Sequence, residues 1–196
     1  MNYHNITYPD MNNGDGLRVV LWLSGCSHHC KNCQNPQTWD KDSGILFDEK
    51  AKEELFKELD KDYISGLTLT GGDPLFKENL DDVLNLISEF NKRYKNDTTY
   101  SSVGENKNNI LNENGNEIRI LLPYKTIWLY TGFKWEDIIH EQSDRYEIIK
   151  QCDIIVDGQY IDELQDFKLK WRGSSNQKVI DVKKSLEQNK IVLYCD

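Results

Sequence analysis

The sequence predicts an α/β protein that folds as an incomplete (β/α) barrel of about five or six mostly parallel strands. Short apolar runs alternate along the chain with amphipathic helical patterns, which is typical of βαβ units. Most of these runs are apolar at consecutive positions, as expected for strands covered on both faces. A complete eight-unit barrel typically needs about 250 residues, whereas this chain has 196.

Six segments have the composition of short strands. Most of them end in a polar or glycine-bearing loop, such as Gly71-Gly72-Asp73-Pro74 after the second. The six are residues 17–23, 66–70, 126–131, 153–156, 178–182 and 190–194.

Three helices are predicted between the strands. Asp48 is expected to cap a helix in which Ala51, Leu55 and Leu59 recur at four-residue spacing. Residues 80–90 carry one apolar face and begin with acidic side chains, which suit a helix N-terminus. Residues 135–150 are expected to form the third helix.

We expect one domain over residues 1–196, interrupted by a polar insertion at about 96–118. This segment contains seven Asn, with Gly104 and Gly115, and few large apolar residues. The composition favours either a mobile segment or a small hairpin around Asn114-Gly115.

The charge and hydropathy of the chain exclude two classes of function. A net charge of −9 repels phosphate backbones, so no nucleic-acid partner is expected. No apolar run approaches the ~18–20 residues that span a bilayer, and the N-terminus lacks the pattern of a signal peptide. The expected location is therefore the cytoplasm, with no membrane partner.

Three cysteines follow the first predicted strand at the spacing C-x3-C-x2-C: Cys26, Cys30 and Cys33. The odd total of five cysteines argues against a disulfide framework. Thiolates on one short loop are the usual ligands of iron–sulfur clusters. A four-iron cluster with three protein ligands keeps one iron open for a substrate.

Two other interpretations of the loop stay open. Zinc could bind the three cysteines with His28 or His29, and the cysteines could also be redox-active or unliganded. We expect His28 and His29 to face solvent or a partner rather than a metal. Cys152 and Cys195 stand alone and read as small core residues.

Further polar and glycine positions occur at the ends of other predicted strands. Gly71 and Gly72 allow the backbone to approach a ligand closely, and Asp73 can accept a hydrogen bond from an ammonium group. Thr131 and Asp157 also end strands, and strand carboxyl ends meet at one mouth of an α/β barrel. Capping of the following turn is the structural alternative for both.

The cysteine loop is the signature of the radical S-adenosylmethionine (SAM) enzymes, and its surroundings resemble those of the glycyl-radical-enzyme activases. In order, several motifs are similar to the activating proteins of anaerobic (class III) ribonucleoside-triphosphate reductases. They are Asn13-Gly14-Asp15-Gly16-Leu17-Arg18, Asn35-Pro36, Trp39, Thr68-Leu69-Thr70-Gly71-Gly72-Asp73-Pro74-Leu75, Trp128-Leu129-Tyr130-Thr131-Gly132-Phe133, Val156-Asp157-Gly158 and Trp171-Arg172-Gly173-Ser174-Ser175-Asn176-Gln177.

The resemblance implies a radical SAM partial barrel with two cofactors, a [4Fe-4S] cluster and SAM. It assigns Cys26, Cys30 and Cys33 to the cluster and the Gly71-Gly72-Asp73 turn to the amino group of SAM. Backbone groups from Asn32 through Cys33 to Gln34 would read the adenine. Thr131 and Asp157 would touch the SAM ribose, its carboxylate or a bound cation.

The implied substrate is a glycine in the large subunit of the reductase, and the implied electron donor is a protein such as flavodoxin. The Trp171–Gln177 stretch, with an exposed-looking Trp171 and Arg172, would serve partner docking or support the site. An ordered loop is the structural alternative for this stretch. Two alternatives remain. One is another short radical SAM enzyme, such as 7-carboxy-7-deazaguanine synthase, and the other is a zinc-stabilised binding module without catalysis.

Overall fold

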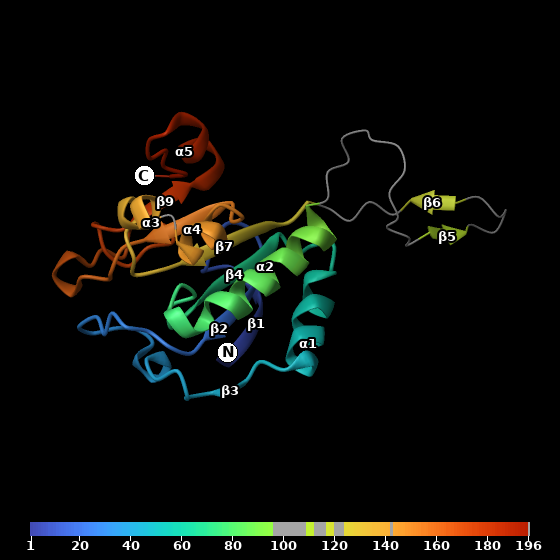
Figure 1. Cartoon of the computed structure of the whole chain (residues 1–196), viewed down its shortest axis with the longest axis horizontal. Coiled ribbons are helices and arrows are strands. Elements are labelled where there is room, and N and C mark those ends of the chain that lie inside the picture. Colours follow the sequence, from blue (N-terminus) through green and yellow to red (C-terminus); the bar gives the residue numbers. More distant parts are fainter. Residues whose placement is uncertain (96–108, 112–116, 120–123, 142, 196) are drawn as a thin grey trace.

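The computed structural model describes residues 1–95, 109–111, 117–119, 124–141 and 143–195. In this part of the chain, a seven-stranded open sheet has the order β3-β1-β2-β4-β7-β8-β9 (Figure 1). The sheet confirms the predicted α/β class and is consistent with an incomplete barrel, with seven strands in place of five or six.

Four parallel strands form the centre of the sheet: β2 (Arg18–Leu23), β4 (Gly66–Gly71), β7 (Thr126–Tyr130) and β8 (Ile154–Asp157). All four were predicted from the sequence. The outer strands are antiparallel to their neighbours: β1 (Asn2–Asp10), β3 (Ile45–Leu46) and β9 (Lys178–Asp181).

The two ends of the chain differ from the sequence-based expectation. Strand β1 was not predicted, because its residues are largely polar and only part of the strand is buried. The strand expected over residues 190–194 is absent from the assigned strands. That segment touches β9 at single points instead, including an isolated bridge between Leu193 and Ile180.

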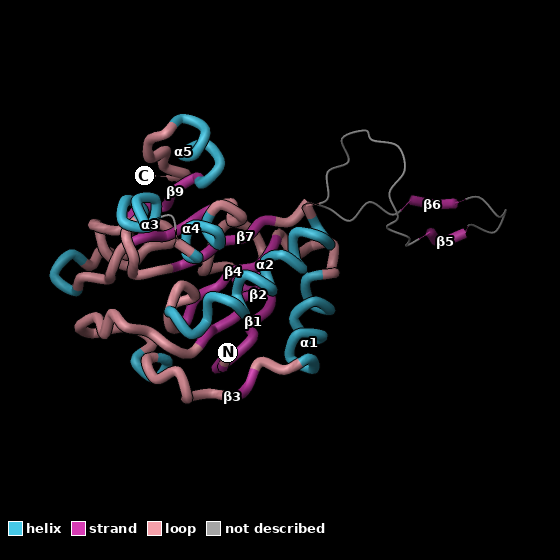
Figure 2. Tube along the Cα trace, in the orientation of Figure 1, coloured by secondary structure: helices cyan, strands magenta, loops and turns pink. Residues whose placement is uncertain are grey.

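The helices follow the predicted order with one break. Helix α1 (Glu49–Leu59) begins at Asp48, whose side chain accepts a hydrogen bond from the Ala51 backbone at 2.9 Å. Helix α2 (Leu80–Tyr94) covers the second prediction. The single helix expected over residues 135–150 is two helices, α3 (Trp135–Glu141) and α4 (Asp144–Ile149) (Figure 2). Ser143, which precedes α4, has an extended backbone and so ends the helical path.

The remaining elements are short. They are α5 (Val182–Gln188) and three 3-10 turns, η1 (Pro36–Thr38), η2 (Lys77–Asn79) and η3 (Asp162–Leu164). The predicted polar insertion, residues 96–118, lies largely outside the described residues, including Asn114-Gly115. Its described parts, β5 (Asn109–Leu111) and β6 (Glu117–Arg119), pair as antiparallel strands.

The sheet separates two apolar clusters. The larger cluster packs α1, α2 and α4 against one face of the sheet and includes Leu21, Leu69 and Leu129 (Figure 1). A smaller cluster contains Trp128 and Val156, with Trp171 packed against it. Since side chains alternate along a strand, Leu129 and its neighbours Trp128 and Tyr130 point to opposite faces. The second face is therefore the interior of the partial barrel.

Arg18 closes the end of this interior where the parallel strands begin. It is fully buried and donates hydrogen bonds to Thr68 Oγ1 at 2.6 Å, to the Leu67 carbonyl at 2.6 Å and to the Thr126 carbonyl at 2.9 Å. Its guanidinium also lies 5.5 Å from the centre of the Trp128 ring. The open end is consequently the one where the strands finish.

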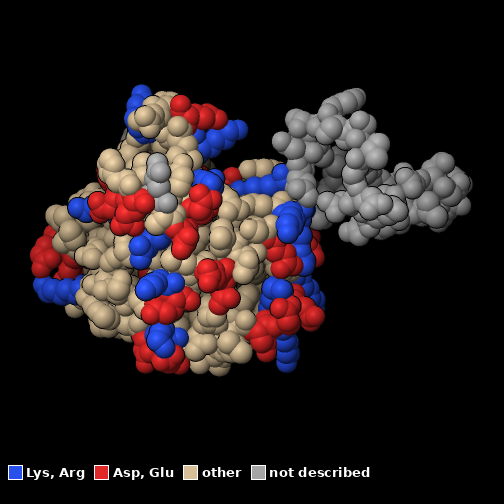
Figure 3. Space-filling view, viewed as in Figure 1, with Lys and Arg blue, Asp and Glu red and all other residues tan. Residues whose placement is uncertain are grey.

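The surface carries both signs of charge. On the face seen in Figure 3, lysines and arginines are interspersed with acidic side chains and form no continuous basic area. Pairs such as Arg93–Glu89 on α2 contribute to this mixture. No helix in the part of the chain that the structure describes combines the length and apolar composition needed to cross a lipid bilayer.

Candidate active site

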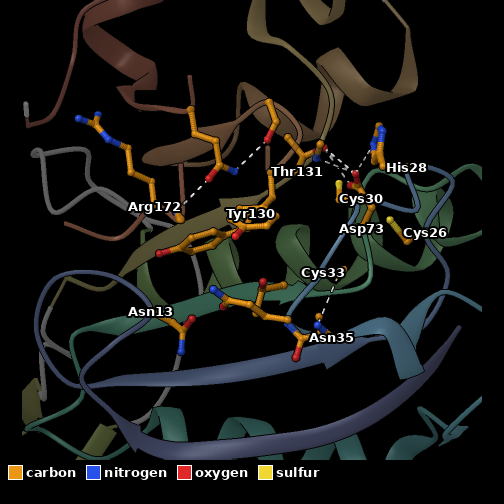
Figure 4. A pocket seen from close by; sticks show the side chains of 18 of the residues that line it. Asn13, Cys26, His28, Cys30, Cys33, Asn35, Asp73, Tyr130, Thr131 and Arg172 are labelled. Carbon is orange, nitrogen blue, oxygen red and sulfur yellow. Dashed lines mark hydrogen bonds and ion pairs between the residues drawn. The ribbon is translucent and has the colours of Figure 1, made fainter. Parts of the chain in front are cut away.

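The predicted site residues converge where the central strands end. The cysteine loop follows β2, the Gly71-Gly72-Asp73 turn ends β4, and Thr131 follows β7. These segments surround a cavity of about 500 Å³, shown in Figure 4. Of the predicted site residues, it is lined by Cys26, Cys30, Cys33, Gln34, Gly71, Gly72, Asp73 and Thr131.

Backbone hydrogen bonds hold the cysteine loop in a tight fold. Cys26 donates its backbone N–H to the Trp39 carbonyl at 3.0 Å, and Cys33 donates to the Cys30 carbonyl at 3.1 Å. The backbone N–H of Asn35 points to the Cys33 sulfur at 3.4 Å. Asn32 adopts a left-handed conformation with φ of 56°, which lets the loop turn back between Cys30 and Cys33.

The donor set of this loop fits an iron–sulfur cluster. All three thiols are half-buried and free of disulfides. Burial raises the pKa of Cys26 to about 11 and raises the pKa of Cys30 as well, so bound iron would be needed to keep these sulfurs deprotonated. Among the described residues, no three His, Cys, Asp or Glu side chains are arranged to hold one metal ion. A cubane differs from such a site because each thiolate binds a separate iron.

Asp73 is the centre of the hydrogen-bond network beside the loop. Its carboxylate is 1% exposed and accepts from the Leu75 backbone at 2.8 Å and the Gly132 backbone at 2.9 Å. The Thr131 hydroxyl donates to it at 2.9 Å. His28 Nε2 lies 2.9 Å from Oδ2 of the same carboxylate, the oxygen that also accepts from Gly132. Asp73 thus joins the ends of β4 and β7 to the cysteine loop.

His28 corrects one expectation from the sequence. Its side chain is 9% exposed and faces the protein rather than solvent. One ring nitrogen bonds Asp73 and the other lies 2.9 Å from the Gln159 amide, while the ring packs on Phe133 with 4.6 Å between centres. Because both nitrogens are engaged, His28 is not available as a fourth zinc ligand. His29 packs against Trp39 at 4.9 Å.

Gly71 and Gly72 serve the contact between β4 and the cysteine loop. Gly71 has φ of 101°, and a Cβ on Gly72 would lie 2.5 Å from the Gly25 carbonyl oxygen. The Gly72 backbone donates to the Leu23 carbonyl, and Asp73 donates to the Gly25 carbonyl, both at 2.7 Å. Both glycines also line the cavity, so they bring the turn close to the space a ligand would fill.

Comparisons with known proteins agree with this arrangement. A family described as a 4Fe-4S single cluster domain matches residues 12–122 and 115–180. The anaerobic ribonucleoside-triphosphate reductase-activating protein of Enterobacteria phage T4 is 40% identical over 179 residues, which is 91% of this chain and 93% of the relative. Its namesake in Escherichia coli K12 is 32% identical over 181 residues, covering 91% and 97%. The Haemophilus influenzae protein of that name is 33% identical over 179 residues, covering 90% and 96%.

This chain belongs to the family of anaerobic ribonucleoside-triphosphate reductase-activating proteins. The resemblance inferred from the motifs is thereby confirmed, and the family has a 4Fe-4S cluster domain. The zinc-module interpretation does not agree with that family.

Two predicted site residues of this activating-protein chain do not line the cavity. Asp157 is buried, and its carboxylate accepts from the Trp135 backbone at 2.9 Å and the Lys178 backbone at 3.1 Å. Burial raises its pKa. The contact with Trp135, the first residue of α3, is the capping role that the sequence left open. Asn32 points outward, and its amide donates to Asp162 at 2.8 Å.

Sequence reasoning did not select several residues that line the same cavity. His28 was noticed, but its direction was not predicted, because cysteine spacing says nothing about where an intervening side chain points. Tyr130, Arg172 and Gln177 lie within quoted motifs, and no role in the cavity was assigned to them individually. Tyr130 could have been found from strand alternation, since Leu129 reads as a core residue.

Proposed function

We propose that this chain is a radical SAM activase that generates the glycyl radical on the large subunit of an anaerobic ribonucleoside-triphosphate reductase. The observation that carries this proposal is the shared cavity. Cys26, Cys30 and Cys33 open onto the same space as the Gly71-Gly72-Asp73 turn, in a chain whose relatives carry that name. The proposed setting is the cytoplasm, with a protein such as flavodoxin as electron donor.

The three cysteines would hold three irons of the cluster and leave the fourth for SAM. No other described cysteine lines the cavity. Cys152 belongs to the larger apolar cluster, and Cys195 packs against the smaller cluster that contains Trp128. When bound, the cluster supplies the single electron that breaks a carbon–sulfur bond of SAM. The overall reaction converts SAM, one electron and a glycine Cα–H into methionine, 5′-deoxyadenosine and a glycyl radical.

The Gly71-Gly72-Asp73 turn would bind the amino end of SAM. The Asp73 carboxylate already accepts bonds from Leu75, Gly132 and Thr131, and it pairs with His28. Backbone carbonyls of the turn are therefore better placed to accept from the SAM ammonium. Asp73 fixes the turn and contributes negative charge nearby.

The other predicted ligand contacts take different roles in this proposal. Backbone groups from Asn32 to Gln34 would read the adenine, since Cys33 and Gln34 line the cavity whereas the Asn32 side chain faces Asp162. Thr131 orients Asp73. Asp157 holds the start of α3 against β8, so its effect on SAM would be indirect.

Anaerobic reconstitution followed by a SAM-cleavage assay tests the proposal. With the reductase present, we expect 5′-deoxyadenosine and an electron paramagnetic resonance signal from a glycyl radical. SAM cleavage without any radical on the reductase would favour a small-molecule enzyme such as 7-carboxy-7-deazaguanine synthase. Protein that holds zinc and takes up no iron or sulfide would exclude the radical SAM mechanism.

A further inference from the structure

The cavity has a second end, away from the thiols, that contains two polar groups without a partner. The Tyr130 hydroxyl and the Arg172 Nε are both buried and make no hydrogen bond within the described residues. Both side chains line the cavity. Figure 4 shows Arg172 and Asn13 across the cavity from Cys26 and Cys30, with Tyr130 between them.

The position of Tyr130 follows from the strand register. Tyr130 ends β7 and pairs with Val156 on β8, while Trp22 on β2 pairs with Thr70 on β4. Trp22, Thr70 and Tyr130 all line the cavity. They form the last interior layer of the barrel, directly beneath the open mouth. A phenol in this layer is held by the sheet rather than by a loop.

Arg172 lies on a loop that is tied to the sheet on both sides. The side chain of Gln177 makes two of these contacts. Its Oε1 accepts a hydrogen bond from the Gly173 backbone at 2.9 Å, and its Nε2 donates to the Gly158 carbonyl at 2.9 Å. Trp171 packs edge-on against Trp128 with 5.0 Å between ring centres. Arg172 is therefore fixed beside the cavity, although no carboxylate among the described residues pairs with it.

Both unpartnered groups are hydrogen-bond donors. The Arg172 Nε carries one N–H and never acts as an acceptor. Burial raises the pKa of Tyr130, so its hydroxyl stays protonated and can donate. Buried polar groups in proteins are normally satisfied. Two unsatisfied donors on one cavity wall indicate a ligand that presents acceptor oxygens there.

We propose that Tyr130 and Arg172 bind backbone carbonyls of the polypeptide segment that carries the target glycine. This inference rests on the proposed function. Glycine has no side chain, so a site that recognises it at close range must contact the backbone around it. SAM is assigned to the opposite end, beside the cysteines and the Gly71-Gly72-Asp73 turn.

The rim of the cavity also suits a polypeptide. Phe167 lines the cavity and is 90% exposed. An exposed aromatic side chain beside a cavity is typical of a contact with another protein. Leu164, 41% exposed, ends η3 three residues before Phe167. A segment bound by Arg172 and Tyr130 would extend across the cavity toward the cysteines (Figure 4).

Two variants test the proposal, each with a matched control. Tyr130→Phe removes one hydroxyl, and Tyr160→Phe removes a hydroxyl that lines the same cavity but already donates to Asp162 at 3.1 Å. Arg172→Gln removes a positive charge, and Lys170→Gln removes one from an exposed neighbour outside the cavity lining.

Each reconstituted protein is assayed twice, for chemically driven SAM cleavage without the reductase and for glycyl radical formation at increasing reductase concentration. For Tyr130→Phe and Arg172→Gln, we expect a rise in the reductase concentration that gives half-maximal glycyl radical formation. The factor of this rise should be at least about ten times the factor by which reductase-free SAM cleavage falls. The two controls should stay within about twofold of the unmodified protein in both assays.

Two results would overturn the inference while leaving the proposed function intact. If the two variants reach half-maximal radical formation at the same reductase concentration as the unmodified protein, the two donors do not bind the reductase. An equal loss of reductase-free SAM cleavage would show that they serve SAM instead. Failure of the unmodified protein to form any glycyl radical would refute the proposed function itself, and the inference with it, before the variants are compared.

Discussion

A methyl group at position 132 tests the contact that joins the cysteine loop to strand β7. A Cβ on Gly132 would lie 2.3 Å from Cδ2 and 2.6 Å from Cγ of His28. Gly132 is not among the glycines with positive φ. Alanine would therefore fit the backbone conformation at this position if the His28 ring were absent. In Gly132→Ala the ring must therefore move, which breaks its 2.9 Å contact with Asp73.

The size of the effect follows from the two terms involved. Overpacking a rigid site costs about 1–3 kcal/mol, and loss of a hydrogen bond to a charged group costs about 1.5–3 kcal/mol. Because moving the ring relieves the overlap, the two terms do not add in full. We expect Gly132→Ala to lower the free energy of unfolding by about 2–3 kcal/mol. In a His28→Ala background the methyl enters vacated space, and the cost should fall below about 1 kcal/mol.

Urea unfolding of the iron-free, reduced protein measures this coupling in four proteins: unmodified, each single variant and the double variant. Iron release from the reconstituted proteins to a chelator provides a second readout, and it should be faster in both single variants. The reasoning is refuted if Gly132→Ala lowers the free energy of unfolding by the same amount, within about 0.5 kcal/mol, in the unmodified protein and in the His28→Ala variant. The His28 ring would then not be what holds the loop against β7.

Three further predictions concern the cluster, the barrel floor and the surface. Cys30→Ala should abolish cluster absorption and SAM cleavage while leaving far-ultraviolet circular dichroism near normal; full cleavage would place the chemistry elsewhere. Arg18→Met should lower the free energy of unfolding by about 3–5 kcal/mol in urea, because the acceptors around Arg18 lose their donor. Lys178 lowers the pKa of Glu136 in the folded protein. The stabilisation by this pair is therefore complete at pH values above the pKa of Glu136 in the unfolded chain, and it is lost as the pH falls through the pKa of Glu136 in the folded protein. Lys178→Met should therefore cost under about 1 kcal/mol at neutral pH and nothing in acid; a constant difference would contradict this.

The sequence predicted strands best where both faces of the strand are buried, and it predicted site residues best where they lie close together in the chain. The segments 66–70 and 153–156 were recognised as strands because both of their faces are buried, which gives consecutive apolar positions. Strand β1 lies near the edge and carries polar residues on its exposed face, so neither composition nor alternation marks it. Segment 190–194 has strand-like composition, but it contacts β9 at only a few backbone positions.

Within the site, the sequence predicted residue identity better than direction. The cysteines and the Gly71-Gly72-Asp73 turn share a cavity because they follow adjacent parallel strands, and that adjacency could be inferred from chain order. The orientation of His28 depends on Asp73 and Gln159, which are 45 and 131 residues away. Trp171 was expected to be exposed, yet it packs on Trp128, a contact that no local pattern encodes.

Two arginines near the barrel interior show why side-chain partners, rather than residue type, distinguish structural from ligand-binding positions. Arg18 is buried at the closed end, and the Thr68 hydroxyl and the Leu67 and Thr126 carbonyls accept its donors. It has no capacity left for a ligand. Arg172 lies at the open end, with a buried Nε that has no partner in the described residues. Both lie within motifs that resemble the family, so only the surrounding acceptors separate them. Polar groups of the interior are thus satisfied at the closed end and unsatisfied at the open end, and this difference supports the proposed substrate recognition by Arg172 and Tyr130.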